Sequence, residues 1–109
     1  MSVGTPNGSN ATTIQREGTL VRVQGPVTLG SVAGLQTLCR PAVSAAGLQL
    51  DLQGATTVDS AALALVLALR RDTEALGGKF EVRNVPAAVV TLAGLYGVGF
   101  LADNSVPHA

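Results

Sequence analysis

Two short segments of alternating polar and apolar residues constrain the fold of this chain more than any other feature. Residues 48–52 read Leu-Gln-Leu-Asp-Leu, and residues 79–83 read Lys-Phe-Glu-Val-Arg. Alternation with a period of two is typical of a β-strand that has one buried face and one solvated face. Strands covered by helices on both faces would instead be apolar throughout. We therefore predict a sheet with helices on one face, and these side chains on its open face: Gln49, Asp51, Glu81 and Arg83.

The segments around these strands predict the order of the remaining elements. Residues 11–16 and 19–24 have strand character and are joined by Glu17-Gly18, as in a hairpin. Three helical patterns are also present, at residues 29–40, 60–76 and 86–97. Because helices separate the later strands, those strands should be parallel and joined by right-handed crossovers. The prediction is an α/β fold whose mixed β-sheet has its helices packed on one face.

Length and composition predict one domain. Residues 1–10 are rich in small polar residues, so we expect a disordered segment there, a domain at 11–102 and a flexible tail at 103–109. The start of the chain does not resemble a signal peptide, and the longest apolar run, 61–69, is too short for a membrane span, which needs about 20 residues. We therefore expect a cytoplasmic protein.

The charge balance argues against some classes of partner. Hydrophobic residues make up 47% of the chain, charged residues 13%, and the formal net charge is zero. Nucleic-acid binding is not expected, because it requires a surplus of Lys and Arg. So few charges instead suggest that a protein partner covers part of the surface.

The pair Asp59-Ser60 opens the most apolar helical pattern of the chain. Asp59 fits a helix N-cap, because its side chain can accept from backbone N–H groups one turn inside the helix. Ser60 would then lie in the first turn, where a hydroxyl is well placed to carry or contact a phosphate. The simpler interpretation is a cap with no further role.

Helical spacing divides residues 60–76 into two faces. One face is suited to packing on the sheet and consists of Ala62, Leu65, Val66, Leu69, Thr73 and Leu76. The other is apolar near Ser60 and charged at its far end, and it consists of Ser60, Leu63, Leu67, Arg70, Arg71 and Glu74. An exposed apolar patch beside Ser60 would suggest a partner surface.

Residues 58–67, Val-Asp-Ser-Ala-Ala-Leu-Ala-Leu-Val-Leu, resemble the Asp-Ser/Thr-x-Gly-Leu loop and helix of STAS domains. This family includes the anti-sigma factor antagonists. A second match is Val85-Pro86 with residues 91–97, Thr-Leu-Ala-Gly-Leu-Tyr-Gly, which looks like the small cytoplasmic STAS subunit of Mla-type phospholipid ABC transporters. The resemblance as a whole covers roughly Thr19 to Leu101.

The resemblance implies a protein that acts by binding rather than by turnover. Its partner would be the ATPase subunit of a phospholipid transporter, with the permease in the same complex. The binding and regulatory residues would be Asp59, Ser60, Leu63, Leu67, Arg70 and Arg71. The protein would lie on the inner face of the cytoplasmic membrane through that complex, without binding lipid directly.

The alternative that the resemblance leaves open is an anti-sigma factor antagonist. Its partner would be a kinase-like anti-sigma factor, and Ser60 would be the phosphoacceptor. Many antagonists have a second hydroxyl and then Gly after that position, whereas this chain has Ala61 and Ala62. This departure weakens the phosphorylation hypothesis and leaves a contact through the Ser60 hydroxyl intact.

The sequence predicts no catalytic site, cofactor or metal. Asp51 and Asp59 flank a predicted loop at residues 53–58, but a paired acid–base site built from them is improbable. Cys39 is expected to be a buried structural thiol, because it lies among apolar residues of a predicted helix. His108, the only histidine, lies one residue from the end of the sequence and is unsuited to a catalytic triad. Tyr96 is expected to be a half-buried ring that closes the third helix, and the alternative is that its hydroxyl caps or orients the Asp59 loop.

Overall fold

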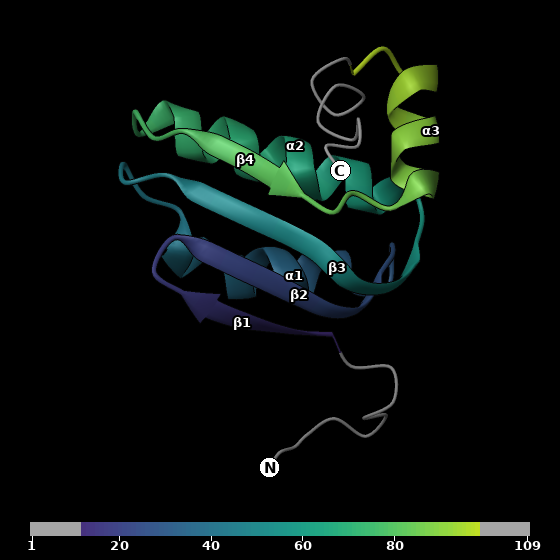
Figure 1. Ribbon diagram of the computed structural model, residues 1–109, viewed down its shortest axis with the longest axis horizontal. Helices are drawn as coiled ribbons and strands as arrows, with labels where there is room; N and C mark the ends of the chain where they lie inside the picture. Colours follow the sequence, from purple (N-terminus) through teal and green to yellow (C-terminus); the bar gives the residue numbers. More distant parts are fainter. Residues whose placement is uncertain (1–11, 99–109) are drawn as a thin grey trace.

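The computed structural model describes residues 12–98, and its elements follow the predicted order (Figure 1). The strands are β1 (Thr13–Glu17), β2 (Leu20–Val27), β3 (Leu48–Val58) and β4 (Phe80–Arg83). The helices are α1 (Val32–Cys39), the short 3₁₀ turn η2 (Arg40–Ala42), α2 (Ser60–Ala75) and α3 (Ala87–Leu95).

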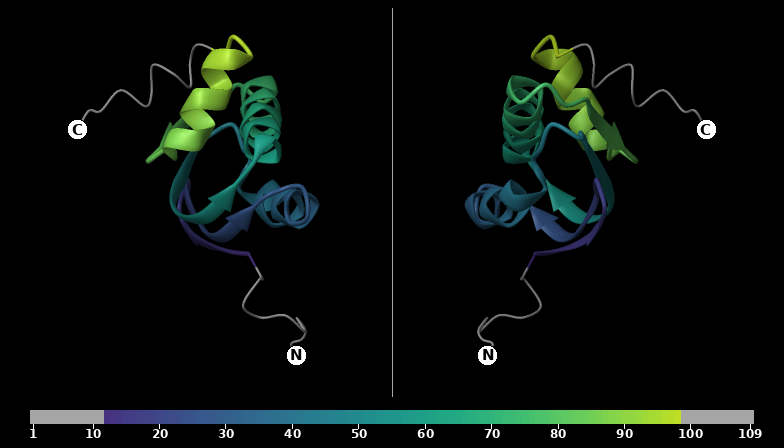
Figure 2. Two further views of the ribbon diagram at one scale, coloured as in Figure 1. Left: turned by 90° about the vertical axis from the view of Figure 1, so that its right-hand side faces the viewer. Right: turned by 90° about the vertical axis from the view of Figure 1, so that its left-hand side faces the viewer.

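The four strands form one mixed sheet in the order β1-β2-β3-β4. β1 and β2 pair antiparallel as a hairpin, whereas β2, β3 and β4 pair parallel through the crossovers that contain α1 and α2. Figure 2 shows α1 and α2 on the same side of the curved sheet, with α3 beside α2. The predicted α/β fold, with a mixed sheet and helices on one face, is confirmed.

The core lies between the sheet and the two helices that cover it. Alternate strand residues supply one side of the core, among them Val21, Val23, Leu48, Leu50, Leu52 and Val82. The helices supply the other side, through Leu35, Cys39, Ala62, Leu65, Val66 and Leu69. Burial of each large aliphatic side chain stabilises the fold by about 1.5–3 kcal/mol, so this layer is the main source of stability.

β3 is longer than the sequence suggested. Residues 53–58, which we expected to be a loop, continue the strand to Val58, and β2 continues through Gly25-Pro26 to Val27. The register between the two strands shifts twice, and each time β3 has one residue more than β2. The first shift lies between the pairs Arg22–Asp51 and Gln24–Gly54. The second lies between the pairs Gly25–Ala55 and Val27–Val58. These irregularities are β-bulges, which bend a strand and break the alternation that identifies it in a sequence.

Asp51 departs from the expected exposed position. It pairs with Arg83 of β4 and Arg22 of β2 in the predicted open-face row, but it is only 8% exposed. Its Oδ1 accepts from the Gln53 backbone N–H (2.9 Å) and from Asn84 Nδ2 (2.9 Å), and its Oδ2 lies 4.0 Å from Arg22 Nε. The carboxylate therefore holds the bulge of β3 and the turn after β4 together.

Some sequence predictions fall outside the described part of the chain. They are the disordered segment at 1–10, the tail at 103–109 with His108, and a short edge strand or turn at Phe100-Leu101. Within residues 12–98, none of the helices combines the length and the apolar character needed to cross a membrane.

The first bulge predicts a strict requirement for glycine at position 54. A Cβ atom there would lie 2.6 Å from the Val23 carbonyl oxygen, which belongs to the backbone and cannot move aside freely. We expect Gly54→Ala to lower the free energy of unfolding by about 1–3 kcal/mol, measured by urea denaturation. The matched control is Gly34→Ala in α1, where a Cβ meets nothing within 4 Å and helix propensity should add about 0.5–1 kcal/mol. Equal stability of Gly54→Ala and the wild type would contradict this account of the bulge.

Candidate functional site

Asp59 joins two segments that are thirty residues apart in the sequence. Its Oδ1 accepts from the Ala61 backbone N–H (2.8 Å), which confirms the predicted N-cap of α2. Its Oδ2 accepts from the Leu29 backbone N–H (3.1 Å) in the loop between β2 and α1. One carboxylate therefore fixes both the start of α2 and the position of the β2–α1 loop.

The β2–α1 loop, residues 28–31, is held by side chains as well as by Asp59. Ser31 Oγ accepts from the Thr28 backbone N–H (3.0 Å) and donates to the Pro26 carbonyl oxygen (2.7 Å), to which Thr12 Oγ1 also donates (2.6 Å). The loop carries Leu29, whose side chain is 80% exposed. Sequence reasoning missed Leu29, because it assigned this residue to the first turn of a helix that begins at Val32.

Ser60 is exposed at the first position of α2. Within residues 12–98, no hydrogen bond engages its hydroxyl. The outward stripe of α2 continues from it through Ala64, Leu67 and Arg71, all of which are exposed. Leu67 is 37% exposed, so the predicted apolar patch beside Ser60 exists in a smaller form.

Leu63 does not belong to this stripe, contrary to the sequence prediction. It is 4% exposed and forms part of the same buried cluster as Val89 and Ala93 of α3. Because α3 packs against α2, a second side of this helix is covered besides the side on the sheet. Leu63 therefore cannot offer its side chain to a partner of the folded domain.

Tyr96 also differs from the expectation. Tyr96 follows the last residue of α3, as expected, but it is 64% exposed rather than half-buried. Among the described residues, the hydrogen bonds to the Asp59 carboxylate come from Ala61 and Leu29, not from Tyr96. The proposed role of its hydroxyl in orienting the Asp59 loop was wrong.

Arg70 and Arg71 lie about 15 Å along α2 from Ser60, as the helical rise requires. Arg70 Nε is 3.3 Å from Glu74 Oε2, and Arg71 Nε is 3.7 Å from Asp72 Oδ1. Exposed pairs of this kind contribute little to stability. These residues can therefore extend a partner surface that starts at Ser60, but they do not form one compact site with it.

The groups weighed for catalysis lie apart from one another. Asp51 accepts from Gln53 and Asn84, whereas Asp59 accepts from Leu29 and Ala61, so the two carboxylates share no partner. Cys39 is fully buried in the core, and this burial raises the pKa of its thiol from 9.0 to about 11. A thiol protonated at neutral pH is a poor nucleophile, so the structure confirms the prediction of a buried structural cysteine.

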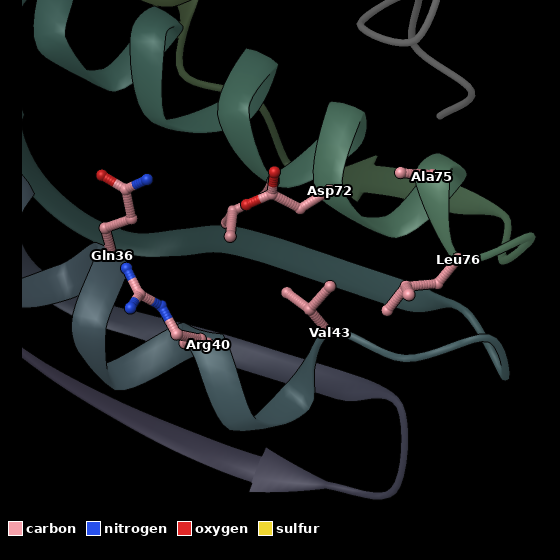
Figure 3. Close-up of a pocket in the computed structure, with 7 residues that line it drawn as sticks. Gln36, Arg40, Val43, Asp72, Ala75 and Leu76 are labelled. Carbon is pink, nitrogen blue, oxygen red and sulfur yellow. The ribbon is translucent and has the colours of Figure 1, made fainter.

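A pocket of about 370 Å³ opens between α1 and α2 (Figure 3). It is lined by Gln36, Arg40, Val43, Leu69, Asp72, Ala75 and Leu76. Its α2 residues belong to the second half of that helix. The pocket is therefore separate from the cap at Asp59 and from Ser60.

Comparisons with known proteins agree with the geometry of this domain. The family model described as "Mlab, STAS domain" matches residues 10–102. No curated protein matches the chain.

Solved structures of similar fold include two of the anti-sigma factor antagonist SpoIIAA. The unphosphorylated form has a TM-score of 0.64 at 18% identity, covering 84% of this chain and 84% of that one. The phosphorylated form, from Bacillus, has a TM-score of 0.63 at 18% identity, covering 84% and 87%. The structure of SLC26A9 has a TM-score of 0.61 at 14% identity, and the match covers 73% of this chain. The same match covers only 16% of the SLC26A9 chain. At these identities the likeness is one of fold.

The Asp59 bridge predicts a combined loss of capping and of loop order in Asp59→Ala. Loss of an N-cap commonly lowers the free energy of unfolding by about 0.5–2 kcal/mol. We also expect faster hydrogen exchange at two amides, those of Ala61 and Leu29, because both lose their acceptor. Unchanged exchange at Leu29 would show that the Asp59 carboxylate does not hold the β2–α1 loop.

The buried thiol of Cys39 predicts a decline of stability at high pH. Because folding raises its pKa to about 11, the folded state keeps a proton that the unfolded state loses above pH 9. The contribution of the thiol is therefore complete below pH 9 and is lost as the pH rises toward 11. Urea denaturation of the wild type and Cys39→Ala from pH 8 to 11 measures it, and parallel pH profiles would contradict the assignment.

Proposed function

Because the chain belongs to the STAS family, we propose that it acts without catalysis, as a regulatory subunit that binds and supports the ATPase subunit of a phospholipid-transporting Mla-type ABC system. The observation that carries this proposal is the family description "Mlab, STAS domain" over residues 10–102. The Leu-Tyr segment at residues 91–97 supports the same branch of the family.

The geometry around Ser60 supports a role in binding. The free hydroxyl of Ser60, the small side chain of Ala64 and the partly exposed Leu67 follow one another on the outward stripe of α2. A partner helix or loop can approach closely over such small residues and bury Leu67. The partner would gain apolar contact without having to desolvate a charge, because the first charged residue along the stripe is Arg71.

In this proposal the domain stays on the cytoplasmic side and reaches the membrane only through its complex. The ATPase subunit would bring it close to the permease, and the domain itself would make no direct contact with lipid. Its effect would be to hold the ATPase subunit in a competent geometry. Assembly or ATP hydrolysis by the partner would rise without any chemical step in this chain.

A second candidate function is that of an anti-sigma factor antagonist. The observation in its favour is the fold shared with SpoIIAA, which has been solved in unphosphorylated and phosphorylated forms, together with the exposed hydroxyl of Ser60. A phosphate on Ser60 would add negative charge directly beside Asp59, and like charges repel at that distance. Binding of a kinase-like partner would then be switched off. Ala61 and Ala62 make this function the less favoured of the two.

The proposed interface predicts that Leu67→Ala weakens binding of the ATPase subunit. Truncation of a leucine buried in the centre of an interface commonly costs about 2 kcal/mol or more, equivalent to a loss of affinity of about 30-fold. Titration calorimetry with the purified ATPase subunit measures the change. Leu76→Ala is the matched control, since Leu76 is 55% exposed at the far end of α2. Equal loss in both variants would contradict the assigned surface.

A complementary prediction concerns Ser60→Asp and the native partner. The added carboxylate would have to be desolvated at the interface beside Asp59, so affinity should fall sharply while the domain stays folded. Purification of the wild type from its own cells, with partner identification and mapping of phosphorylated residues, separates the two functions. Recovery of an ATPase and a permease supports the transporter subunit. Recovery of a kinase-like anti-sigma factor, with phosphate on Ser60 and no transporter subunit, would overturn it.

A further inference from the structure

Charged residues are unevenly distributed along the described part of the chain. Residues 12–98 contain thirteen charged residues, and the segments 23–39, 52–69 and 84–98 contain only one of them, Asp59. The other twelve lie in the remaining segments and are Arg16, Glu17, Arg22, Arg40, Asp51, Arg70, Arg71, Asp72, Glu74, Lys79, Glu81 and Arg83.

The fold brings a large part of the three uncharged segments to the same end of the domain. This part contains the carboxyl-terminal halves of β2 and β3, the starts of α1 and α2, and α3. The later turns of α1 and α2 run toward the other end, where Gln36 and Leu69 line the pocket that also contains Arg40 and Asp72. In Figure 1 the carboxyl ends of these strands and the start of α3 lie together on the right. The antiparallel β1 agrees with the pattern, because its uncharged Thr13 pairs with Gln24 and its charged end, Glu17, pairs with Leu20.

Asp59, the one charge at this end, is already engaged. Both of its carboxylate oxygens accept backbone N–H groups, and it lies at the positive end of the α2 dipole. A partner therefore meets no unsatisfied charge here. It meets Leu29, which at 80% exposure is the most exposed large hydrophobic side chain in the described part of the chain.

The backbone of Leu29 is held rigidly although its side chain is exposed. Its N–H is bound by Asp59, and the loop is closed by two backbone bonds to the Thr28 carbonyl, from Ser31 (2.9 Å) and from Val32 (2.9 Å). A side chain presented on an ordered loop loses little further freedom when it is buried by a partner. Rigid apolar anchors of this kind give interfaces a large share of their affinity.

We propose that Leu29 is the anchor of this end of the domain and inserts into an apolar pocket with an uncharged rim on a protein partner. Resting on the proposed function, the inference assigns this pocket to the same ATPase subunit. The chemistry of the surface favours a protein over an anionic membrane, because lipid headgroups and nucleic acid are bound through Lys and Arg, and neither occurs in the three uncharged segments.

Asp59 acts in this interface as a positioning residue. Asp59→Asn keeps one acceptor oxygen for Ala61, but its amide group cannot accept from the Leu29 N–H. The cap of α2 should therefore survive while the β2–α1 loop loosens. Affinity for the ATPase subunit should fall by less than in Leu29→Ala, and hydrogen exchange should become faster at Leu29 but not at Ala61.

The experiment is titration calorimetry of the purified ATPase subunit with four forms of the full chain: wild type, Leu29→Ala, Asp59→Asn and Leu76→Ala. We expect Leu29→Ala to lose on the order of 10- to 100-fold in affinity. Leu76→Ala, a truncation at the charged end, should bind like the wild type. Because Leu29 is exposed, circular dichroism and the midpoint of thermal unfolding should not change in Leu29→Ala.

The outcomes separate this inference from the proposed function. If the wild type and Leu29→Ala bind the ATPase subunit equally well, Leu29 is not the anchor of the interface, and the proposed function stands. If the wild type does not bind the ATPase subunit, the proposed function fails, and the assignment of the Leu29 pocket fails with it. Methyl NMR of the wild type is the second measurement, in which Leu29 resonances should shift on addition of the ATPase subunit and those of Leu76 should not. Shifts at Leu76 without shifts at Leu29 would overturn the anchor.

Discussion

The bridge made by the Asp59 carboxylate is the interaction on which the candidate surface depends. Its two oxygens serve two different elements, the first turn of α2 and the loop before α1. A capping serine or threonine has a single oxygen and could not do both with the same geometry. One side chain, that of Asp59, therefore fixes the positions of the exposed Ser60 and Leu29 relative to each other. The order of the surface that they form depends on the two hydrogen bonds of this carboxylate.

β3 is irregular along the part of the strand that leads to this bridge. Its two bulges lie in the second half of the strand. β3 ends at Val58, which pairs with Val27, the last residue of β2, and Asp59 follows directly after Val58. Asp51, on the same strand, accepts the Gln53 N–H near the first bulge and binds Asn84, which has the left-handed backbone angle φ of 55°. The two carboxylates thus order the two turns that lead into α2 and α3.

Local patterns in the sequence predicted most of the architecture, because alternation and capping depend on near neighbours. The strand cores at residues 48–52 and 79–83, the helix order and the cap at Asp59 were all accessible in this way. Features that depend on contacts between distant segments were not. Leu63 is buried in the same core cluster as residues of α3, which packs on α2, and helical spacing alone cannot detect a second covered side. The length of β3 was hidden by its bulges, and Leu29 was assigned to a helical pattern although the helix begins only at Val32.

The separation of charge between the two ends of the domain is not required by the fold. The fold needs apolar residues in its core, and the buried cluster draws on both ends alike, with Leu48 and Ala42 near one end and Val27 and Val89 near the other. An exposed position such as Leu29 contributes nothing to that core, so a charged residue there would leave the domain equally stable and more soluble. An exposed leucine at the end of the domain that lacks free charges gains binding energy only when a partner covers it. The proposed protein partner, with a matching apolar surface, would account for both features at once, the missing charges and the rigid loop that carries Leu29.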